Sequence, residues 1–258
     1  MSSRSPKYLS GLDSLRWLSA LAVLVTHVEL HKGYHGLENY WDRVWVRNLG
    51  PVGVYFFFTL SGFLITWLLL RERNRHPAEV LPSFYLRRAC RILPLYYLMV
   101  VLGFAVFPAV TQDTTDDVWL GRVTPELIAF ASGQPHVASA FLRRVPFVSH
   151  LWSIGVELTF YGFWPFIVLY SRRVQRSAVR FVVLALLCKA VLALAARSFT
   201  ENPQPWFHLA ATLKFECMAI GGWFAMPHSR RITQFIDHRI VPWAAISLVP
   251  VMFLFYGT

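Results

Sequence analysis

Long runs of apolar residues alternate with short arginine-rich segments along the 258-residue chain. A helix needs about 20 mostly apolar residues to cross the hydrocarbon core of a bilayer. Seven stretches of the chain meet this length. A further apolar stretch, at 124–133, is too short to cross and is predicted to be re-entrant or interfacial. Because only helices satisfy their own backbone hydrogen bonds in lipid, the pattern predicts an all-α, polytopic transmembrane bundle of seven or eight segments. The seven predicted spans are 12–30, 51–70, 92–110, 151–170, 180–197, 207–226 and 240–257.

Arginines concentrate in three segments between the predicted spans, at 71–91, 171–180 and 227–239. Cytoplasmic loops of membrane proteins carry such an excess of positive charge. If the N-terminus is cytoplasmic and seven helices cross in turn, all three segments fall on the cytoplasmic side. The segment 111–149, which begins with acidic residues at 113–117, then faces outward, and Arg143 and Arg144 in it are the exception; the 124–133 element could hold them.

Composition supports the membrane class. Hydrophobic residues make up 55% of the chain and charged residues 15%, and the mean hydropathy is +0.44, which is more apolar than a soluble domain of this size requires. The net charge of +11 would suit nucleic-acid binding, but the arginines follow the loops and no groove-reading motif accompanies them. The three cysteines are far apart and match neither a metal site nor a disulfide framework. With no repeat or linker, we expect one domain over 1–258 and no metal or nucleic acid.

Arg16 and His27 interrupt the first predicted span, which is too long for a signal peptide and has no small-residue cleavage site after it. Eleven residues separate the two, so helical geometry places them on one face and about 16 Å apart along the axis. Ionisable groups at such depth usually face a bundle interior or an aqueous cavity. One interpretation is a functional pair; the other is a histidine hydrogen-bonded between helices and an arginine that reaches the membrane surface.

Glu157 lies inside the span 151–170, four residues after Ser153 and on the same helical face, with His150 three residues further back. Because this helix enters from the outside, Glu157 is predicted at a depth comparable to that of His27. A carboxylate beside an imidazole can hold its tautomer and stabilise its protonated form. The alternative is a structural glutamate bonded to a neighbouring helix.

Arg88 and Arg91 lie three residues apart at the predicted start of the span 92–110. Two guanidiniums on one face would suit bidentate phosphate binding, although the charge bias of cytoplasmic loops is the simpler explanation of these residues taken by themselves. Pro94 is expected to bend the start of the helix. Gly53 and Ser61 lie in the second span, where small residues allow close helix packing; no base near Ser61 supports a nucleophile.

Four stretches carry a family resemblance: "LDSLRWLSALAVLVTH", "GVYFFFTLSGFLIT", "FYLRRACRILPLYYL" and "LWSIGVELTFYGFWP". Together they resemble the acyltransferase 3 family of integral membrane acyltransferases, which includes bacterial O-antigen and exopolysaccharide O-acetyltransferases. The resemblance runs from residue 12 to about 170. It departs from the family at Leu158, where a second acidic residue is common, and in the number of spans, which is about ten in the family. The chain thus resembles a short member or one that lacks C-terminal spans.

The resemblance implies a role for each matching residue. It implies that His27 is catalytic, that Arg16 is its motif partner and that Glu157 acts with them. It implies that Arg88 and Arg91 bind the acyl donor. The residues that it implies as supporting are Ser153 and Asp13.

What the resemblance implies about function is transfer of an acyl group, with acetyl expected, from cytoplasmic acyl-CoA to a hydroxyl of an envelope glycan, exopolysaccharide or similar acceptor. The location is then the bacterial inner membrane, with acetyl-CoA as donor substrate and no permanently bound cofactor. His27, oriented by Glu157, would be the general base or carry the acyl group transiently. A transporter or flippase that uses the same polar residues as a pathway is the rival from another class. An inactive fragment with a structural role is a third possibility.

Overall fold

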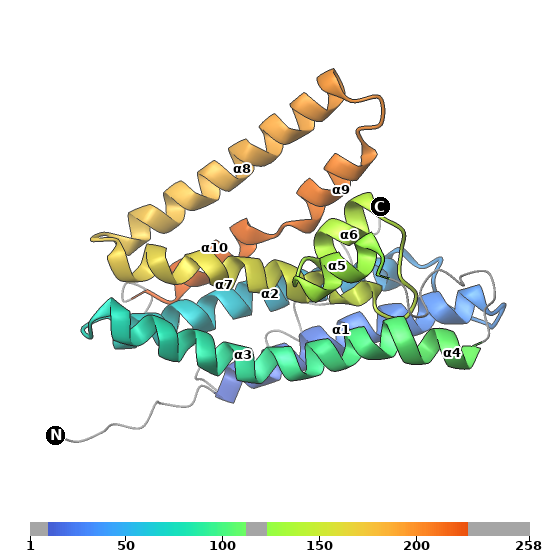
Figure 1. Cartoon of the computed structure of the whole chain (residues 1–258), viewed down its shortest axis with the longest axis horizontal. Helices are drawn as coiled ribbons and strands as arrows, with labels where there is room; N and C mark the ends of the chain where they lie inside the picture. Colours follow the sequence, from blue (N-terminus) through green and yellow to red (C-terminus); the bar gives the residue numbers. More distant parts are fainter. Residues whose placement is uncertain (1–9, 112–122, 227–258) are drawn as a thin grey trace. The chain divides into compact units, whose positions relative to one another are not determined.

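The computed structural model describes residues 10–111 and 123–226, and these residues form helices and connecting turns with no strand among them. The all-α prediction is therefore confirmed for the described part of the chain (Figure 1). The helices in chain order are α1 Ser10–Tyr34, α2 Val44–Glu72, α3 Pro77–Val101, the π-helical segment η1 Leu102–Val106, α4 Phe107–Thr111, α5 Pro125–Ala131, α6 Pro135–Phe141, the 3-10 turn η3 Ser149–Leu151, α7 Trp152–Tyr170, α8 Val174–Phe199, α9 Gln204–Thr212 and α10 Phe215–Phe224.

Among residues 10–111 and 123–226, four helical segments are long and apolar enough to cross a membrane: Val44–Glu72, Pro77–Val110, Ser149–Tyr170 and Val174–Phe199. They contain four of the predicted spans. Only 6% of the most apolar 18-residue stretch of α8 is buried within the chain, as expected for a helix that presents aliphatic side chains to lipid. The first predicted span is also one long helix, α1, but its ionisable residues leave it less apolar than these four.

The predicted span 207–226 is wrong as a single helix. The structure has two shorter helices there, α9 and α10, because the backbone is extended at Leu213 (φ −66°, ψ 109°). Lys214 follows the break and Glu216 lies in the first turn of α10, so the apolar run carries two charges where the helix is interrupted. The predicted span 240–257 and the basic segment 227–239 lie outside the described residues, as does the acidic stretch 113–117.

The predicted cytoplasmic loop 71–91 is mostly helical, which corrects the positions of its arginines. α2 continues to Glu72, and α3 begins at Pro77 after His76, whose Nδ1 accepts a hydrogen bond from the Ala78 N–H at 3.3 Å. Proline suits the first turn of a helix, where its missing N–H costs no hydrogen bond. Arg88 and Arg91 therefore lie in the interior of α3 rather than at its start, and Pro94 lies inside the helix as well.

The described residues form two compact units. The first contains 10–67 and 220–226, and the second contains 68–111 and 123–219. In the first unit, α1 and α2 pack closely at small residues: a Cβ on Gly53 would lie 2.7 Å from the carbonyl oxygen of Ser19. Thr26 Oγ1 donates a hydrogen bond to the carbonyl of Val46 at 3.1 Å. The predicted packing role of Gly53 is confirmed.

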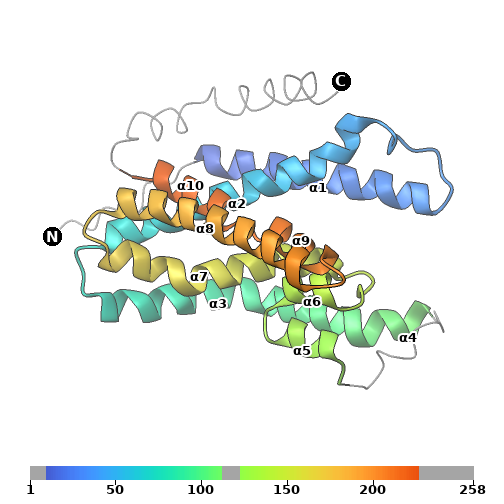
Figure 2. The ribbon, with the colours of Figure 1, turned by 90° about the horizontal axis from the view of Figure 1, so that it is seen from above.

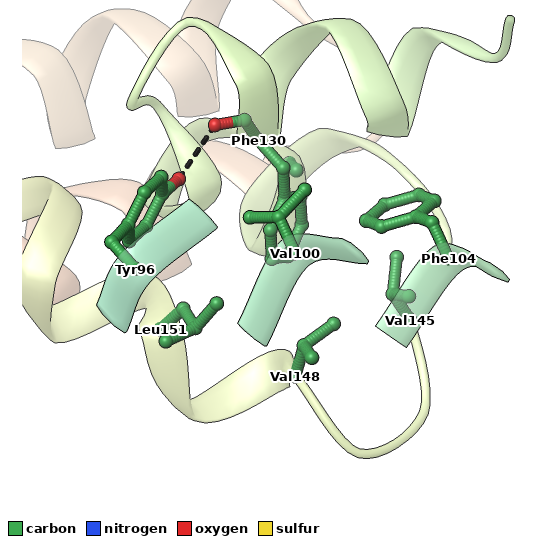
Figure 3. Close-up of a cluster of buried hydrophobic side chains, with 8 residues drawn as sticks. Tyr96, Val100, Phe104, Phe130, Val145, Val148 and Leu151 are labelled. Carbon is green, nitrogen blue, oxygen red and sulfur yellow. Dashed lines mark hydrogen bonds between the residues drawn. The ribbon is translucent and has the colours of Figure 1, made fainter. Parts of the chain in front are cut away.

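A hydrophobic cluster in the second unit joins α3 and η1 to α5, α6 and η3 (Figure 3). Tyr96 lies in this cluster, and its hydroxyl donates a 2.6 Å hydrogen bond to the carbonyl of Phe130 at the end of α5. Thr124 caps α5 by accepting a hydrogen bond from the Leu127 N–H. The short 124–133 element is thus a seven-residue helix packed on the core of its unit. The cluster consists of Tyr96, Val100, Phe104, Phe130, Ala138, Val145, Val148 and Leu151.

Aromatic side chains hold α7 against α8 and α10 within the second unit. Phe160 stacks on Trp164 with ring centroids 4.8 Å apart, and Phe181 and Trp164 are T-shaped with ring centroids 5.5 Å apart. Phe215 of α10 lies 5.4 Å from Phe163. Such aromatic pairs add to the stabilisation from burial alone. They place the start of α8 beside the C-terminal half of α7.

The two ends of α7 have different surroundings. Figures 1 and 2 both show α5 and α6 beside one end, while the turn into α8 lies at the opposite end. At that second end, Arg73 Nη2 donates a hydrogen bond to the carbonyl of Ser171. Tyr85 of α3 also donates to the carbonyl of Gly162 at 2.8 Å. The first bond thus ties the α2–α3 turn to the α7–α8 turn, and the second ties α3 to the middle of α7.

Candidate active site

The imidazole of His27 is exposed on α1 and is oriented by its own helix. Its Nδ1 lies 2.8 Å from the carbonyl oxygen of Val23, one turn earlier. A carbonyl can only accept, so Nδ1 carries the proton in this contact. In the neutral ring, Nε2 then keeps its lone pair and can take up a proton. The contact with Val23 therefore orients the ring and leaves Nε2 without a bond to its own helix.

Glu29 secures the end of α1 just beyond His27. Its carboxylate accepts a 3.0 Å hydrogen bond from Lys32 Nζ and a 2.7 Å hydrogen bond from the Tyr40 N–H in the following segment. Lys32 also lies 5.9 Å from the ring centroid of Tyr40. These contacts hold the 35–43 segment against the helix that carries His27.

Arg16 and Asp13 lie in the first turns of the same helix. α1 is unbroken from Ser10 to Tyr34, so the prediction that Arg16 and His27 share one helical face is confirmed. Arg16 is half-buried, and Asp13, one turn earlier, is exposed. The arginine thus stands on the face of His27, three turns towards the N-terminus.

Ser153 and Glu157 lie one turn apart on α7 in the second unit, and both are half-buried. Ser153 Oγ donates a 3.2 Å hydrogen bond to the carbonyl of His150. Between them, Gly155 faces α6 so closely that a Cβ would lie 2.6 Å from Pro135 Cδ and 2.7 Å from His136 Nδ1. The glycine therefore lets α6 approach α7 beside Glu157. Glu157 and His27 belong to different units, and their pairing stays a prediction.

Arg88 and Arg91 lie on α3 with different surroundings. The guanidinium carbon of Arg88 is 5.9 Å from the ring centroid of Phe84, and the side chain is half-buried. Arg91 is exposed. Their spacing places them on neighbouring positions of one face. Their binding of the acyl donor stays a prediction.

The sequence analysis missed an ion pair between α8 and α10. Lys189 Nζ lies 2.6 Å from Glu216 Oε1, and the two side chains are 22% and 14% exposed. The second oxygen, Oε2 of Glu216, is buried and has no hydrogen-bond partner among the described residues. One signal was present: Lys189 is the sole charged residue between 181 and 196. An isolated charge in an apolar helix indicates a partner on another helix.

A second missed group lies between α5 and α6. Glu126 is 5% exposed and accepts a 3.3 Å hydrogen bond from the backbone N–H of Arg143. The predicted contact of the 124–133 element with this arginine thus exists, but it uses the backbone rather than the guanidinium. His136 is 3% exposed, and its burial lowers its pKa to about 4.

The helices and the ionisable groups that they carry define an all-α membrane protein with polar chemistry inside apolar segments. A family model described as an acyltransferase domain matches residues 9–258. The chain belongs to this acyltransferase family, and the match spans both compact units. No solved structure matches the chain.

Three curated relatives show which kinds of acyltransferase the chain is similar to. A Staphylococcus aureus (strain COL) protein provisionally named an O-acetyltransferase is 31% identical over 169 residues, which cover 63% of this chain and 25% of the relative. A Bacillus subtilis (strain 168) protein provisionally named a peptidoglycan O-acetyltransferase is 26% identical over 231 residues, covering 82% and 32%. The peptidoglycan O-acetyltransferase of Listeria monocytogenes is 29% identical over 165 residues, covering 62% and 24%. This chain therefore spans about a quarter to a third of the length of these relatives.

Proposed function

We propose that the chain is a membrane O-acetyltransferase that moves an acetyl group from cytoplasmic acetyl-CoA to a hydroxyl of a cell-envelope glycan. The observation that carries the proposal is the His27 imidazole, exposed and held by Val23 so that Nε2 is available as a base. Membership of the acyltransferase family and relatives named as peptidoglycan O-acetyltransferases support it. Peptidoglycan or a similar envelope glycan is the proposed acceptor.

In the proposed reaction, Nε2 of His27 accepts the proton of the acceptor hydroxyl while its oxygen attacks the thioester carbonyl. The carbon–sulfur bond then breaks, the thiolate of CoA leaves, and the imidazolium returns the proton to it. The Nδ1–H of His27 keeps its hydrogen bond to the carbonyl of Val23 throughout, and this dipole stabilises the cation. A positioned base of this kind contributes about 10²–10⁴-fold to the rate.

The same nitrogen could instead carry the acetyl group in two steps, with an acetyl-imidazole formed from the donor and consumed by the acceptor. The two routes differ in one observable. Rapid quenching with labelled acetyl-CoA and no acceptor gives labelled protein if His27 is an acyl carrier. We propose the base role, so no label is expected on the protein.

The donor would approach from the cytoplasm, with the N-terminus on the same side and the chain in the inner membrane. Arg88 and Arg91 on α3 supply guanidiniums that suit the phosphates of CoA. A cysteine-accessibility scan tests this orientation. Labelling of the α2–α3 turn from the outside would contradict it.

The test of the function is transfer of labelled acetyl groups to envelope glycan in membranes that contain the chain. His27→Gln should lower the rate by about 10²–10⁴-fold. His31→Gln is the matched control, because His31 lies one turn further on α1 and is also exposed. An equal rate for the wild type and His27→Gln would remove the histidine from the mechanism. Transport of a glycan without acetyl transfer by the wild type would favour the transporter interpretation.

The proposed partnership of His27 with Glu157 has its own test. In a background without natural cysteines, cysteines at both positions should be joined in membranes by a short bifunctional reagent. Cysteine at Ser149, at the start of the segment before α7, in place of position 157 is the control. Failure of the 27–157 pair to cross-link, with activity of the wild type intact, would leave Glu157 a structural residue.

A further inference from the structure

A pocket of about 450 Å³ lies at the turn between α7 and α8. Its lining contains four guanidiniums and two hydroxyls and no carboxylate. The volume is in the range of small-molecule sites and exceeds what a single phosphate ion needs. We call it the arginine pocket; its lining residues are Ser171, Arg172, Arg173, Arg176, Ser177 and Arg180.

The charge of the arginine pocket is uncompensated. Among the described residues, none of its four arginines forms an ion pair. By contrast, Arg87 of α3 lies 2.9 Å from Glu72 at the end of α2, and Arg75 in the α2–α3 turn lies 3.3 Å from Glu79. Cytoplasmic charge bias explains arginines on this side but does not explain why these four gather around one hollow without acids. Four cations in one hollow repel each other, and a bound anion would relieve that repulsion.

The arginine pocket is also held in shape. The carbonyl of Ser171 accepts a hydrogen bond from Arg73, and the Oγ atoms of Ser171 and Ser177 are 2.7 Å apart. In the first turns of α8, Val174 and Ala178 are buried against the rest of the unit. Arg173 and Arg176 are exposed. A preformed site binds with a smaller loss of conformational entropy.

The N-terminus of α8 adds donors to the same place. α8 is 26 residues long, and the side chain of its N-cap residue, Arg173, makes no capping hydrogen bond in the described structure. The first turn of a helix carries N–H groups without partners in the helix and a partial positive charge. A cap with an acidic or hydroxyl side chain would occupy these groups, and here a cation stands in its place. This helix end therefore favours an anion from outside the chain.

We propose that the arginine pocket binds a ligand that bears two or more phosphates. Guanidiniums bind phosphate oxygens in bidentate pairs, and the serine hydroxyls and helix N–H groups add further donors. Two sources share this chemistry: the nucleotide part of the acyl donor and the headgroup of an anionic phospholipid. The first rests on the proposed function, and the second does not.

The nucleotide arm measures binding of adenosine 3′,5′-bisphosphate to the purified full chain in a neutral detergent by calorimetry. The double variant R173Q/R176Q should raise the Kd by about 10-fold or more, because it removes two charged donors to the phosphates. R75Q/R87Q is the matched control, because it removes two arginines near the α2–α3 turn that already have acidic partners. The affinity of the wild type should fall with rising salt.

The lipid arm measures retention of labelled phosphatidylglycerol through purification, with phosphatidylcholine as the neutral probe. R173Q/R176Q should lose the retained anionic lipid, and R75Q/R87Q should keep it. Bisphosphate binding with no lipid effect identifies the nucleotide source, and the reverse identifies the lipid. Neither assay depends on acetyl transfer, so the arginine pocket can hold its ligand even if the proposed activity is wrong.

If R173Q/R176Q does not fold, R173K/R176K keeps the charge and the orientation signal. Lysine lacks the planar fork of arginine, so the bisphosphate Kd or the lipid retention should still weaken several-fold. The proposal is overturned if neither double variant differs from R75Q/R87Q in either assay. The four arginines would then act only as orientation signals.

Discussion

Lys189 of α8 and Glu216 of α10 form an ion pair at 2.6 Å, although each lies in a helix made mostly of apolar residues. The break before α10 sets its first turn, which holds Glu216, beside α8. A charge in an apolar environment is costly without a partner, so each residue depends on the other. The pair therefore ties the broken region α9–α10 to the long helix α8.

Removing one partner should destabilise the chain more than removing both. Lys189→Met leaves a buried carboxylate without its cation and should cost up to about 3–5 kcal/mol of unfolding free energy. Lys189→Met with Glu216→Leu should recover most of that loss, because no charge is left unpaired. Denaturant unfolding in detergent micelles measures both. Additive effects of the two single changes would show that the ion pair contributes no coupling.

Two glycines of α7 should respond oppositely to the same substitution. Gly155→Ala places a Cβ within 2.6 Å of Pro135 and 2.7 Å of His136, and it should cost about 1–3 kcal/mol through overpacking. Gly162→Ala meets nothing within 4 Å and should stabilise the helix by about 0.5–1 kcal/mol. Thermal unfolding of the two variants compares them directly. Equal shifts would mean that α6 does not rest on Gly155.

Acid should destabilise the second unit through His136. Burial lowers the pKa of this side chain from 6.5 to about 4, so between these values the unfolded chain takes up a proton that the folded chain does not. The contribution of His136 to the free energy of unfolding should therefore be constant above pH 6.5. It should fall by up to about 3 kcal/mol as the pH approaches 4. His136→Gln should flatten the profile. His208→Gln, at an exposed position, should not.

Substitution of the arginines of α3 should weaken binding of the acyl donor more than it slows the chemical step. Arg88→Gln or Arg91→Gln should raise the KM for acetyl-CoA by about 10-fold and leave kcat nearly unchanged, because phosphate contacts are made in both the ground and the transition state. Arg75→Gln, in the turn before α3, is the control. Steady-state kinetics in membranes separates the two parameters. Unchanged KM values would assign these arginines to orientation alone.

Much of the helical arrangement was predictable from the lengths of the hydrophobic runs. A segment that crosses lipid must satisfy its own backbone hydrogen bonds, so a long apolar run predicts a helix. The helices around 51–70, 92–110, 151–170 and 180–197 follow from that rule. The break at Leu213 was not predictable, since a run of apolar residues does not reveal a change of backbone dihedral angles. The helical start of α3 at Pro77 differs from the predicted loop, because an excess of arginines indicates the side of the membrane and not the backbone conformation.

The candidate site divides in a similar way. Helical periodicity was sufficient to place Arg16 and His27 on one face, because both residues lie on the same unbroken helix. The hydrogen bond between His27 Nδ1 and the carbonyl of Val23 depends on the side-chain rotamer of His27. No sequence pattern predicts that rotamer. Orientation of His27 by Glu157 stays a prediction, and the structure adds a contact within α1 itself, from Nδ1 to the carbonyl of Val23.

The sequence by itself determined the class of the protein, the approximate positions of its apolar helices and the shared face of Arg16 and His27, because these depend on local composition and helical periodicity. Only the tertiary structure decided which distant residues meet. It paired Lys189 with Glu216 and brought Gly155 into contact with α6. Such contacts depend on how helices far apart in sequence pack together, and no local pattern carries that information.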